Sequence, residues 1–199
     1  VRMEPGSTFK TIAMMAALDD GKVNIDDTLR VWKDGWYYHG ATHRDAHPAD
    51  TVYTMRQALA VSSNIALARM ITDGYNGSAK KFVNKLKRMG LCDSIDYIIP
   101  GAHQPRINIP KDTVTISRMA YGYSVELSPL QILTFYNGIA NNGRMISPVL
   151  VTEVKDGKTT VESFETQTIR SSLCSKNTLK DIQASLLDVV WDNDLGTAA

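Results

Sequence analysis

Residues 4–10, Glu-Pro-Gly-Ser-Thr-Phe-Lys, and the apolar run over residues 11–18 decide how this chain folds. Pro5-Gly6 favours a turn, and the positions after Lys10 are hydrophobic almost without interruption up to Asp19-Asp20-Gly21, where the glycine is a typical helix stop. A helix that is apolar on every face has no side to present to water, so it belongs in the interior of a domain. The segment therefore predicts a buried helix that begins at Ser7.

Ser7 and Lys10 are a candidate nucleophile and base. A serine hydroxyl reacts well only when a base lies within hydrogen-bond reach. If Ser7 opens the helix, Lys10 lies one turn later on the same face, and burial would lower the pKa of the lysine so that it can accept a proton. Backbone N–H groups at the helix start can also stabilise an oxyanion. The alternative is an ordinary helix cap and a surface lysine, because Ser-x-x-Lys is a short motif that occurs by chance.

A second candidate motif is Ser62-Ser63-Asn64, between two expected helices. Ser62 is suited to relay a proton between Lys10 and a leaving group, and the Asn64 side chain can hold a substrate amide. Serine and asparagine are also common helix caps, which is the structural alternative. Ser-x-x-Lys followed by Ser-x-Asn is an order known from serine acyl-transferases, so the two motifs together favour a catalytic interpretation.

The remaining sequence predicts a helix-rich α+β fold. Capping boxes at Thr54 to Gln57 and at Ser128 to Gln131 mark two helix starts, and five basic residues of the 78–89 segment are expected on its solvated face. Those five are Lys80, Lys81, Lys85, Lys87 and Arg88. We expect loops and short strands over 23–52, helices over 54–60, 65–72, 78–89, 128–140 and 178–190, a loop over 100–115, and a β-hairpin over 149–164.

At this point the chain resembles a known family. Residues 3–10 look like the active-site segment of class B penicillin-binding proteins, and residues 61–65 are similar to their second motif. The family also has a loop followed by a helix, which is similar to residues 119–123, 126–131 and 141–143. The segment just ahead of its third motif is similar to residues 189–190 and 196–198. The resemblance is strongest to the division-type (septal) transpeptidases, and it implies the penicillin-binding, serine β-lactamase-like fold.

The family's third motif, Lys-Thr/Ser-Gly, has no match in residues 1–199. Leu195 precedes Gly196 where the motif needs threonine or serine, and no lysine precedes it. We therefore expect residues 1–199 to be a partial transpeptidase domain. It would comprise the active-site helix and helical subdomain, without the first sheet strands and the third-motif strand.

The resemblance implies a peptidoglycan D,D-transpeptidase. Ser7 would attack the penultimate D-alanine of a D-Ala-D-Ala stem peptide, Lys10 would take its proton, Ser62 would pass it to the departing D-alanine, and Asn64 would bind the acyl-side amide. β-Lactams would acylate Ser7. The alternatives on the same motifs are a serine β-lactamase, a β-lactam sensor and a non-catalytic division scaffold, and without the third motif the chain itself can be inactive.

Other features bear on cofactors and partners. Lys plus Arg number 22 against 21 Asp plus Glu, without a basic run, which argues against nucleic acid. Gly40 and Pro48 argue against a helix that would align His39, His43 and His47 on a metal, and we expect neither a metal nor an organic cofactor. Cys92 and Cys174 lack metal-ligand spacing and are expected to be separate thiols, a disulfide being the alternative. Four clustered aromatic residues predict a small satellite core or, alternatively, a docking surface: Trp32, Trp36, Tyr37 and Tyr38.

The resemblance also implies partners and a location. The partners are peptidoglycan stem peptides, β-lactam antibiotics and membrane proteins of the division complex. The parent protein would be anchored in the bacterial inner membrane with this domain on the periplasmic side, and the longest apolar stretch here, residues 11–18, is too short to be that anchor. The loop around Gly122, flanked by Tyr121 and Tyr123, is placed under the cleft, where it shapes the site.

Overall fold

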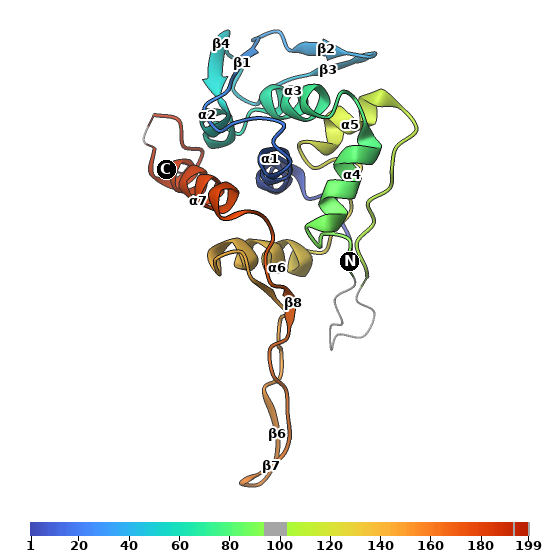
Figure 1. Ribbon diagram of the computed structural model, residues 1–199, viewed down its shortest axis with the longest axis vertical. Helices are drawn as coiled ribbons and strands as arrows, with labels where there is room; N and C mark the ends of the chain where they lie inside the picture. The colour runs from blue at the N-terminus through green and yellow to red at the C-terminus, as the bar shows by residue number, and fades with distance from the viewer. Residues whose placement is uncertain (94–102, 193, 199) are drawn as a thin grey trace.

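A computed structural model describes residues 1–93, 103–192 and 194–198. Its centre is helix α1 (Phe9–Asp19), entered through a 3₁₀ turn, η1 (Gly6–Thr8). The other helices surround α1, with α3, α4 and α7 in contact with it (Figure 1). Nine consecutive residues of α1 are buried, from Phe9 to Ala17. The prediction of a buried central helix is confirmed, because every face of α1 meets another element.

Six further helices make up most of the body. They are α2 (Met55–Ala60), α3 (Asn64–Gly74), α4 (Ala79–Arg88), α5 (Thr113–Met119), α6 (Pro129–Ala140) and α7 (Lys176–Trp191). Both predicted capping boxes are present, at Thr54 and Ser128, and each satisfies the first free N–H groups of its helix. Helix α5 lies partly inside the segment predicted as a loop. Asp112 starts it by accepting from the backbone N–H of Thr115 at 2.7 Å.

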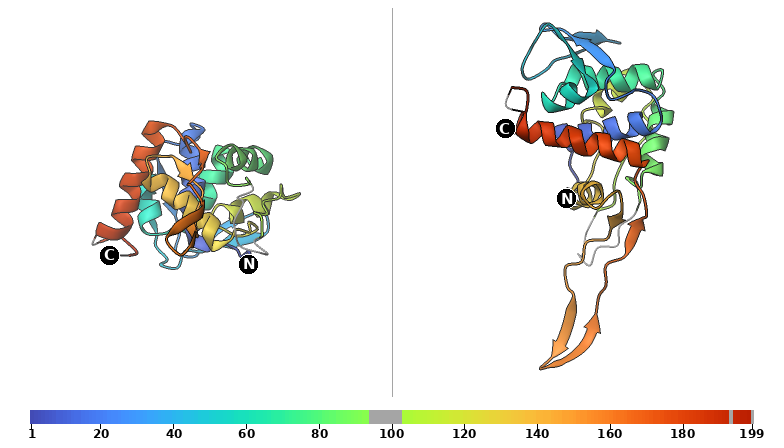
Figure 2. Two further views of the ribbon diagram at one scale, coloured as in Figure 1. Left: turned by 90° about the horizontal axis from the view of Figure 1, so that it is seen from below. Right: turned by 60° about the vertical axis from the view of Figure 1, so that its left-hand side comes forward.

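The strands form four separate antiparallel pairs in the described part of the chain, so the helix-rich α+β class is confirmed. β1 (Thr28–Val31) pairs with β4 (Thr51–Thr54), and β2 (Trp36–Tyr38) pairs with β3 (Ala41–His43). β5 (Met145–Ile146) pairs with β8 (Thr168–Arg170), and β6 (Glu153–Asp156) pairs with β7 (Thr159–Ser163). The predicted hairpin is the β6–β7 pair, which extends far from the helical body with every strand residue exposed (Figures 1 and 2).

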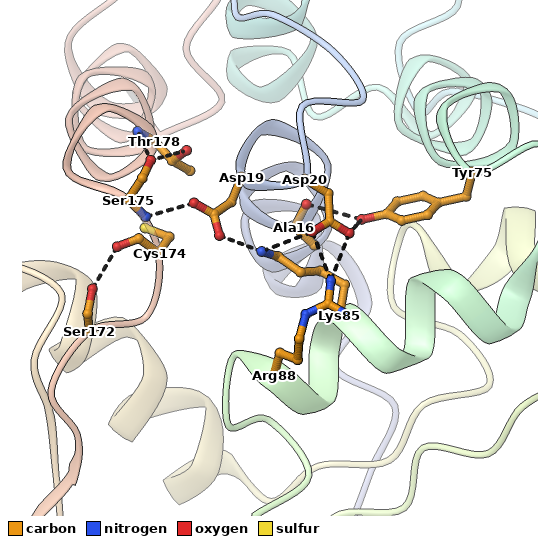
Figure 3. Close-up of polar contacts among 10 residues, drawn as sticks. All are labelled: Ala16, Asp19, Asp20, Tyr75, Lys85, Arg88, Ser172, Cys174, Ser175 and Thr178. Atoms are coloured by element: carbon orange, nitrogen blue, oxygen red, sulfur yellow. Dashed lines mark hydrogen bonds and ion pairs between the residues drawn. The ribbon is translucent and has the colours of Figure 1, made fainter.

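A network of charged groups fixes the C-terminal end of α1 (Figure 3). Asp19 and Asp20 lie where the helix dipole disfavours negative charge, and Lys85 from α4 forms ion pairs with both. Arg88 Nη2 lies 2.9 Å from Asp20 Oδ1, and Asp19 Oδ1 accepts from the backbone N–H of Ser175 at 2.7 Å. The prediction that Lys85 faces solvent was wrong. It is 5% exposed, because its partners come from a distant segment that helical periodicity cannot reveal.

Both cysteines are unpaired, as expected. Burial raises the pKa of each thiol, that of Cys174 to about 11 with a further contribution from the nearby Asp19 carboxylate. Among the described residues, no helix is both long and apolar enough to cross a membrane.

Candidate active site

Lys10 is the chemically unusual residue of the site. Its side chain is 1% exposed, and its Nζ donates to the Ser62 carbonyl oxygen at 2.5 Å and to Ser62 Oγ at 2.8 Å. Burial lowers the pKa of Lys10 from its ordinary 10.5 to about 8, while the Asp45 carboxylate opposes part of that change. The lysine therefore spends an appreciable fraction of its time uncharged near neutral pH, which is what a general base requires.

Ser62 owes its orientation to the backbone between α2 and α3. Its φ of 54° is left-handed, a conformation that costs a non-glycine residue about 1 kcal/mol. The alternative to a catalytic role for Ser62 was that it caps a helix. The cap of α3 is Ser63 instead, whose Oγ accepts from the N–H of Ala66 at 3.0 Å. The Ser62 hydroxyl is consequently available to Lys10. Such strain persists only where the surroundings fix it, and it is typical of functional sites.

Asp45 holds this turn, and sequence reasoning missed it. Its Oδ2 accepts from Ser63 Oγ at 2.8 Å and its Oδ1 from the N–H of Ile65 at 2.9 Å. In the same place, Asn64 Nδ2 donates to the Arg44 carbonyl at 2.8 Å. Residues 44–45 are thus hydrogen-bonded to the second motif across about twenty residues of sequence. No local sequence pattern predicts such a contact, since it depends on where the β2–β3 hairpin and the residues after it pack in the folded chain.

Ser7 lies in the 3₁₀ turn, two residues before Phe9, where α1 begins, so the prediction that the α-helix begins at Ser7 was two residues early. Its side chain is exposed, and within the described residues its hydroxyl has no hydrogen-bond partner. Lys10, three residues later and in α1, directs its Nζ to Ser62, and within the described residues no hydrogen bond joins it to Ser7. The structure brings Lys10 and Ser62 into direct contact and places Asn64 two residues further along.

The loop around Gly122 packs directly on the turn that contains Ser7. The N–H of Gly6 donates to the Gly122 carbonyl at 3.3 Å, and the N–H of Ser124 donates to Glu4 Oε1 at 2.8 Å. Gly122 has φ of +90°, and a Cβ there would lie 2.1 Å from the Gly6 carbonyl oxygen. Only glycine permits this backbone-to-backbone contact. Residues far apart in sequence are therefore in contact beside Ser7.

The three histidines do not share a helix. His43 is buried on β3, while His39 packs edge-on against Tyr38 with ring centroids 4.4 Å apart and His47 is exposed. In the described ranges, no three histidine, cysteine or acidic side chains come together as a possible metal site. Trp36 stacks on Tyr38 as a satellite core would, whereas Tyr37 is 70% exposed.

Comparison with known proteins places this geometry in a family. The sequence profile of the penicillin binding protein transpeptidase domain matches residues 1–199. A probable peptidoglycan D,D-transpeptidase, PbpC of Pseudomonas aeruginosa, is 27% identical over 150 residues, which are 72% of this chain and 25% of that protein. Penicillin-binding protein PbpB of Mycolicibacterium smegmatis is 26% identical over 199 residues, 97% of this chain and 30% of that protein.

Solved structures show the same fold. Penicillin-binding protein 2X of Streptococcus thermophilus superposes with a TM-score of 0.84 at 20% identity, over 99% of this chain and 29% of that one. The transpeptidase domain of Burkholderia pseudomallei penicillin-binding protein 3 superposes with a TM-score of 0.78 at 23% identity, over 98% of this chain and 55% of that one. The chain thus spans less than a third of the length of these curated relatives. It belongs to the penicillin-binding protein transpeptidase domain family.

Proposed function

We propose that the protein containing this chain is a class B peptidoglycan D,D-transpeptidase that crosslinks the septal cell wall through an acyl-serine intermediate. The observation that supports this most is the buried Lys10, held by Ser62 with its pKa lowered to about 8 beside the turn of Ser7. A buried, partly uncharged lysine next to a serine in a left-handed turn has little structural purpose. As a base it has an obvious one.

Each residue has a definite role in this proposal. Ser7 Oγ attacks the carbonyl of the penultimate D-alanine while Lys10 Nζ takes the hydroxyl proton. When the tetrahedral intermediate collapses, Ser62 Oγ donates its proton to the departing D-alanine amine and regains one from Lys10, 2.8 Å away. Asn64 binds the acyl-side amide, and the acyl-Ser7 is then attacked by an amine of a neighbouring stem peptide. A β-lactam follows the same first step and leaves a stable acyl-serine.

The chain would supply the active-site helix and helical subdomain of the enzyme. The strand that carries Lys-Thr/Ser-Gly in the family has no counterpart in residues 1–199. We propose that the parent protein is anchored in the inner membrane with this domain on the periplasmic side. There it would meet stem peptides, β-lactams and membrane proteins of the division complex.

The test is intact-mass detection of a covalent adduct with a fluorescent penicillin, on the wild type and on Ser7→Ala. One adduct per chain that is lost in Ser7→Ala supports the proposal. Steady hydrolysis of nitrocefin would instead indicate a β-lactamase. If neither this chain nor the longer protein containing it forms an adduct, the acyl-transferase proposal fails and a scaffold of the same fold remains.

A further inference from the structure

A buried histidine lies behind the Gly122 loop, outside the proposed chemistry. His43 ends β3 and is 2% exposed. Its Nδ1 lies 2.6 Å from the Tyr121 hydroxyl and its Nε2 lies 3.0 Å from Ser117 Oγ. Both ring nitrogens therefore have partners inside the protein, as buried polar atoms require, and these partners tie β3 to α5 and to the loop after it.

The partners fix the tautomer of the ring. Ser117 Oγ lies 2.6 Å from the carbonyl of Val114, which can only accept, so the serine donates its proton there. Ser117 must then accept from His43, which puts the imidazole proton on Nε2. Nδ1 is left as an acceptor, and Tyr121 donates its O–H to it. Burial, with the Arg118 charge nearby, lowers the pKa of His43 and favours this neutral form.

The other side of Tyr121 leads to the nucleophile. Tyr121 is adjacent to Gly122, whose carbonyl accepts from the N–H of Gly6 at 3.3 Å. That hydrogen bond is long, and such a bond alone adds little to the order of a surface turn. The 2.6 Å contact of Tyr121 with His43 is short and partly buried. It is thus better suited than the Gly6 bond to fix where the loop lies.

We propose that His43 is a positioning residue that, through Tyr121, holds the Gly122 loop against the turn carrying Ser7. The β2–β3 hairpin, which is followed by residues 44–45 that are hydrogen-bonded to the second motif, thereby acquires a further link to the site. The catalytic consequence rests on the proposed function, whereas the positioning itself does not. A displacement of about 1 Å at a reacting group is enough to cost on the order of 100-fold in rate.

The test compares Tyr121→Phe with Tyr38→Phe in the full chain. Each change removes one phenolic oxygen from the same aromatic cluster, but Tyr38 stacks on Trp36, whereas Tyr121 contacts His43 and immediately precedes Gly122. Hydrogen exchange at the Gly6 amide reports the position of the loop without requiring activity. Acylation by a fluorescent penicillin is measured in parallel, with the rate constant separated from the initial binding affinity.

Tyr121→Phe should speed exchange at Gly6 by about tenfold or more, and it should slow the acylation step by roughly 10- to 100-fold with little change in initial affinity. Tyr38→Phe should do neither. His43→Gln, whose amide supplies one acceptor and a donor, should give a Gly6 exchange rate and an acylation rate between those of the wild type and of His43→Leu. If one variant proves too unstable to examine, the remaining variants still test the positioning role.

Unchanged Gly6 exchange in Tyr121→Phe and in His43→Leu would overturn the positioning role. Faster exchange in a chain that never forms a penicillin adduct, in any variant or the wild type, would sustain the positioning role and refute the proposed function. Faster exchange with an unchanged acylation rate would sustain the positioning of the loop and overturn its consequence for Ser7.

Discussion

Replacement of Lys10 by methionine tests whether the lysine is desolvated as its surroundings indicate. Methionine is similar in length and can occupy the buried position of the Lys10 side chain, but it cannot carry charge. In the wild type, the ammonium is 1% exposed, and in the unfolded chain it lies in water. The two proteins should therefore differ in how their stability depends on pH, whatever the constant cost of the lost hydrogen bonds.

The size and sign of the effect follow from the pKa. Lowering the pKa of Lys10 from 10.5 to about 8 corresponds to about 3 kcal/mol, at roughly 1.4 kcal/mol per pH unit. Between these two values the unfolded chain binds more protons than the folded one, so stability rises with pH in that interval. The contribution is complete above pH 10.5 and is lost as the pH falls through about 8.

The assay is urea unfolding of both proteins at several pH values from about 7 to 11, with the difference in unfolding free energy plotted against pH. Between about pH 8 and pH 10.5, the unfolding free energy of the wild type should rise by up to about 3 kcal/mol relative to that of Lys10→Met. Below and above this interval the difference should not change with pH. Taking the difference cancels the titration of all other groups. Lys81→Met, at an exposed position of α4, is the matched control and should give a flat line. A flat line for Lys10→Met as well would mean that the lysine is solvated, and the argument for a base would fail.

Three further changes test other parts of the site. Asp45→Asn should shift the pH midpoint of penicillin acylation to lower pH, because the carboxylate charge raises the pKa of Lys10; a shift to higher pH would contradict the electrostatics. Gly122→Ala should lower the unfolding free energy by about 2 kcal/mol or more and abolish acylation, since its Cβ would overlap the Gly6 backbone; a calorimetric melting temperature equal to that of the wild type would disprove the close contact. Lys85→Met should cost about 3–5 kcal/mol in urea unfolding because it leaves two paired carboxylates without their shared buried cation, whereas Arg88→Met, with a side chain 61% exposed, should cost less than about 1 kcal/mol; equal losses would argue against a buried network.

The features that the sequence predicted correctly are those with a local physical cause. The buried helix followed from an uninterrupted apolar run, and the starts of α2 and α6 followed from capping boxes. The pairing of Ser7 with Lys10 stays a prediction, since Ser7 lies in η1 and the Lys10 ammonium bonds to Ser62. That Lys10 would lie near Ser62 was implied only by the family resemblance, since nothing in residues 10 or 62 alone requires them to meet.

What the sequence did not reveal depends on contacts between distant segments. Asp45 is an ordinary loop aspartate until the chain folds back on Ser63, and Lys85 is one of five basic residues of its segment until Asp19 and Asp20 approach it. Helix α5 was missed because it is short, and its seven residues have too little periodicity to stand out from a loop. His43 shows the same limit, since the sequence argued against a metal site at the three histidines but indicated no other role, and its actual partners lie on α5 and the loop after it.

The charges at the two ends of α1 explain how a lysine can be buried without loosening the fold. An apolar helix alone can slide or rotate among apolar neighbours, because hydrophobic contact is non-directional. The ion pairs of Asp19 and Asp20 with Lys85 are directional, and they fix the C-terminal end of α1 against α4, while the Ser175 N–H fixes it against α7 (Figure 3). Nearer the other end, the Tyr136 hydroxyl donates to the Thr8 carbonyl at 2.8 Å and lies 2.9 Å from Thr11 Oγ1. Directional contacts near both ends of α1 therefore oppose sliding or rotation that would carry Lys10 away from Ser62.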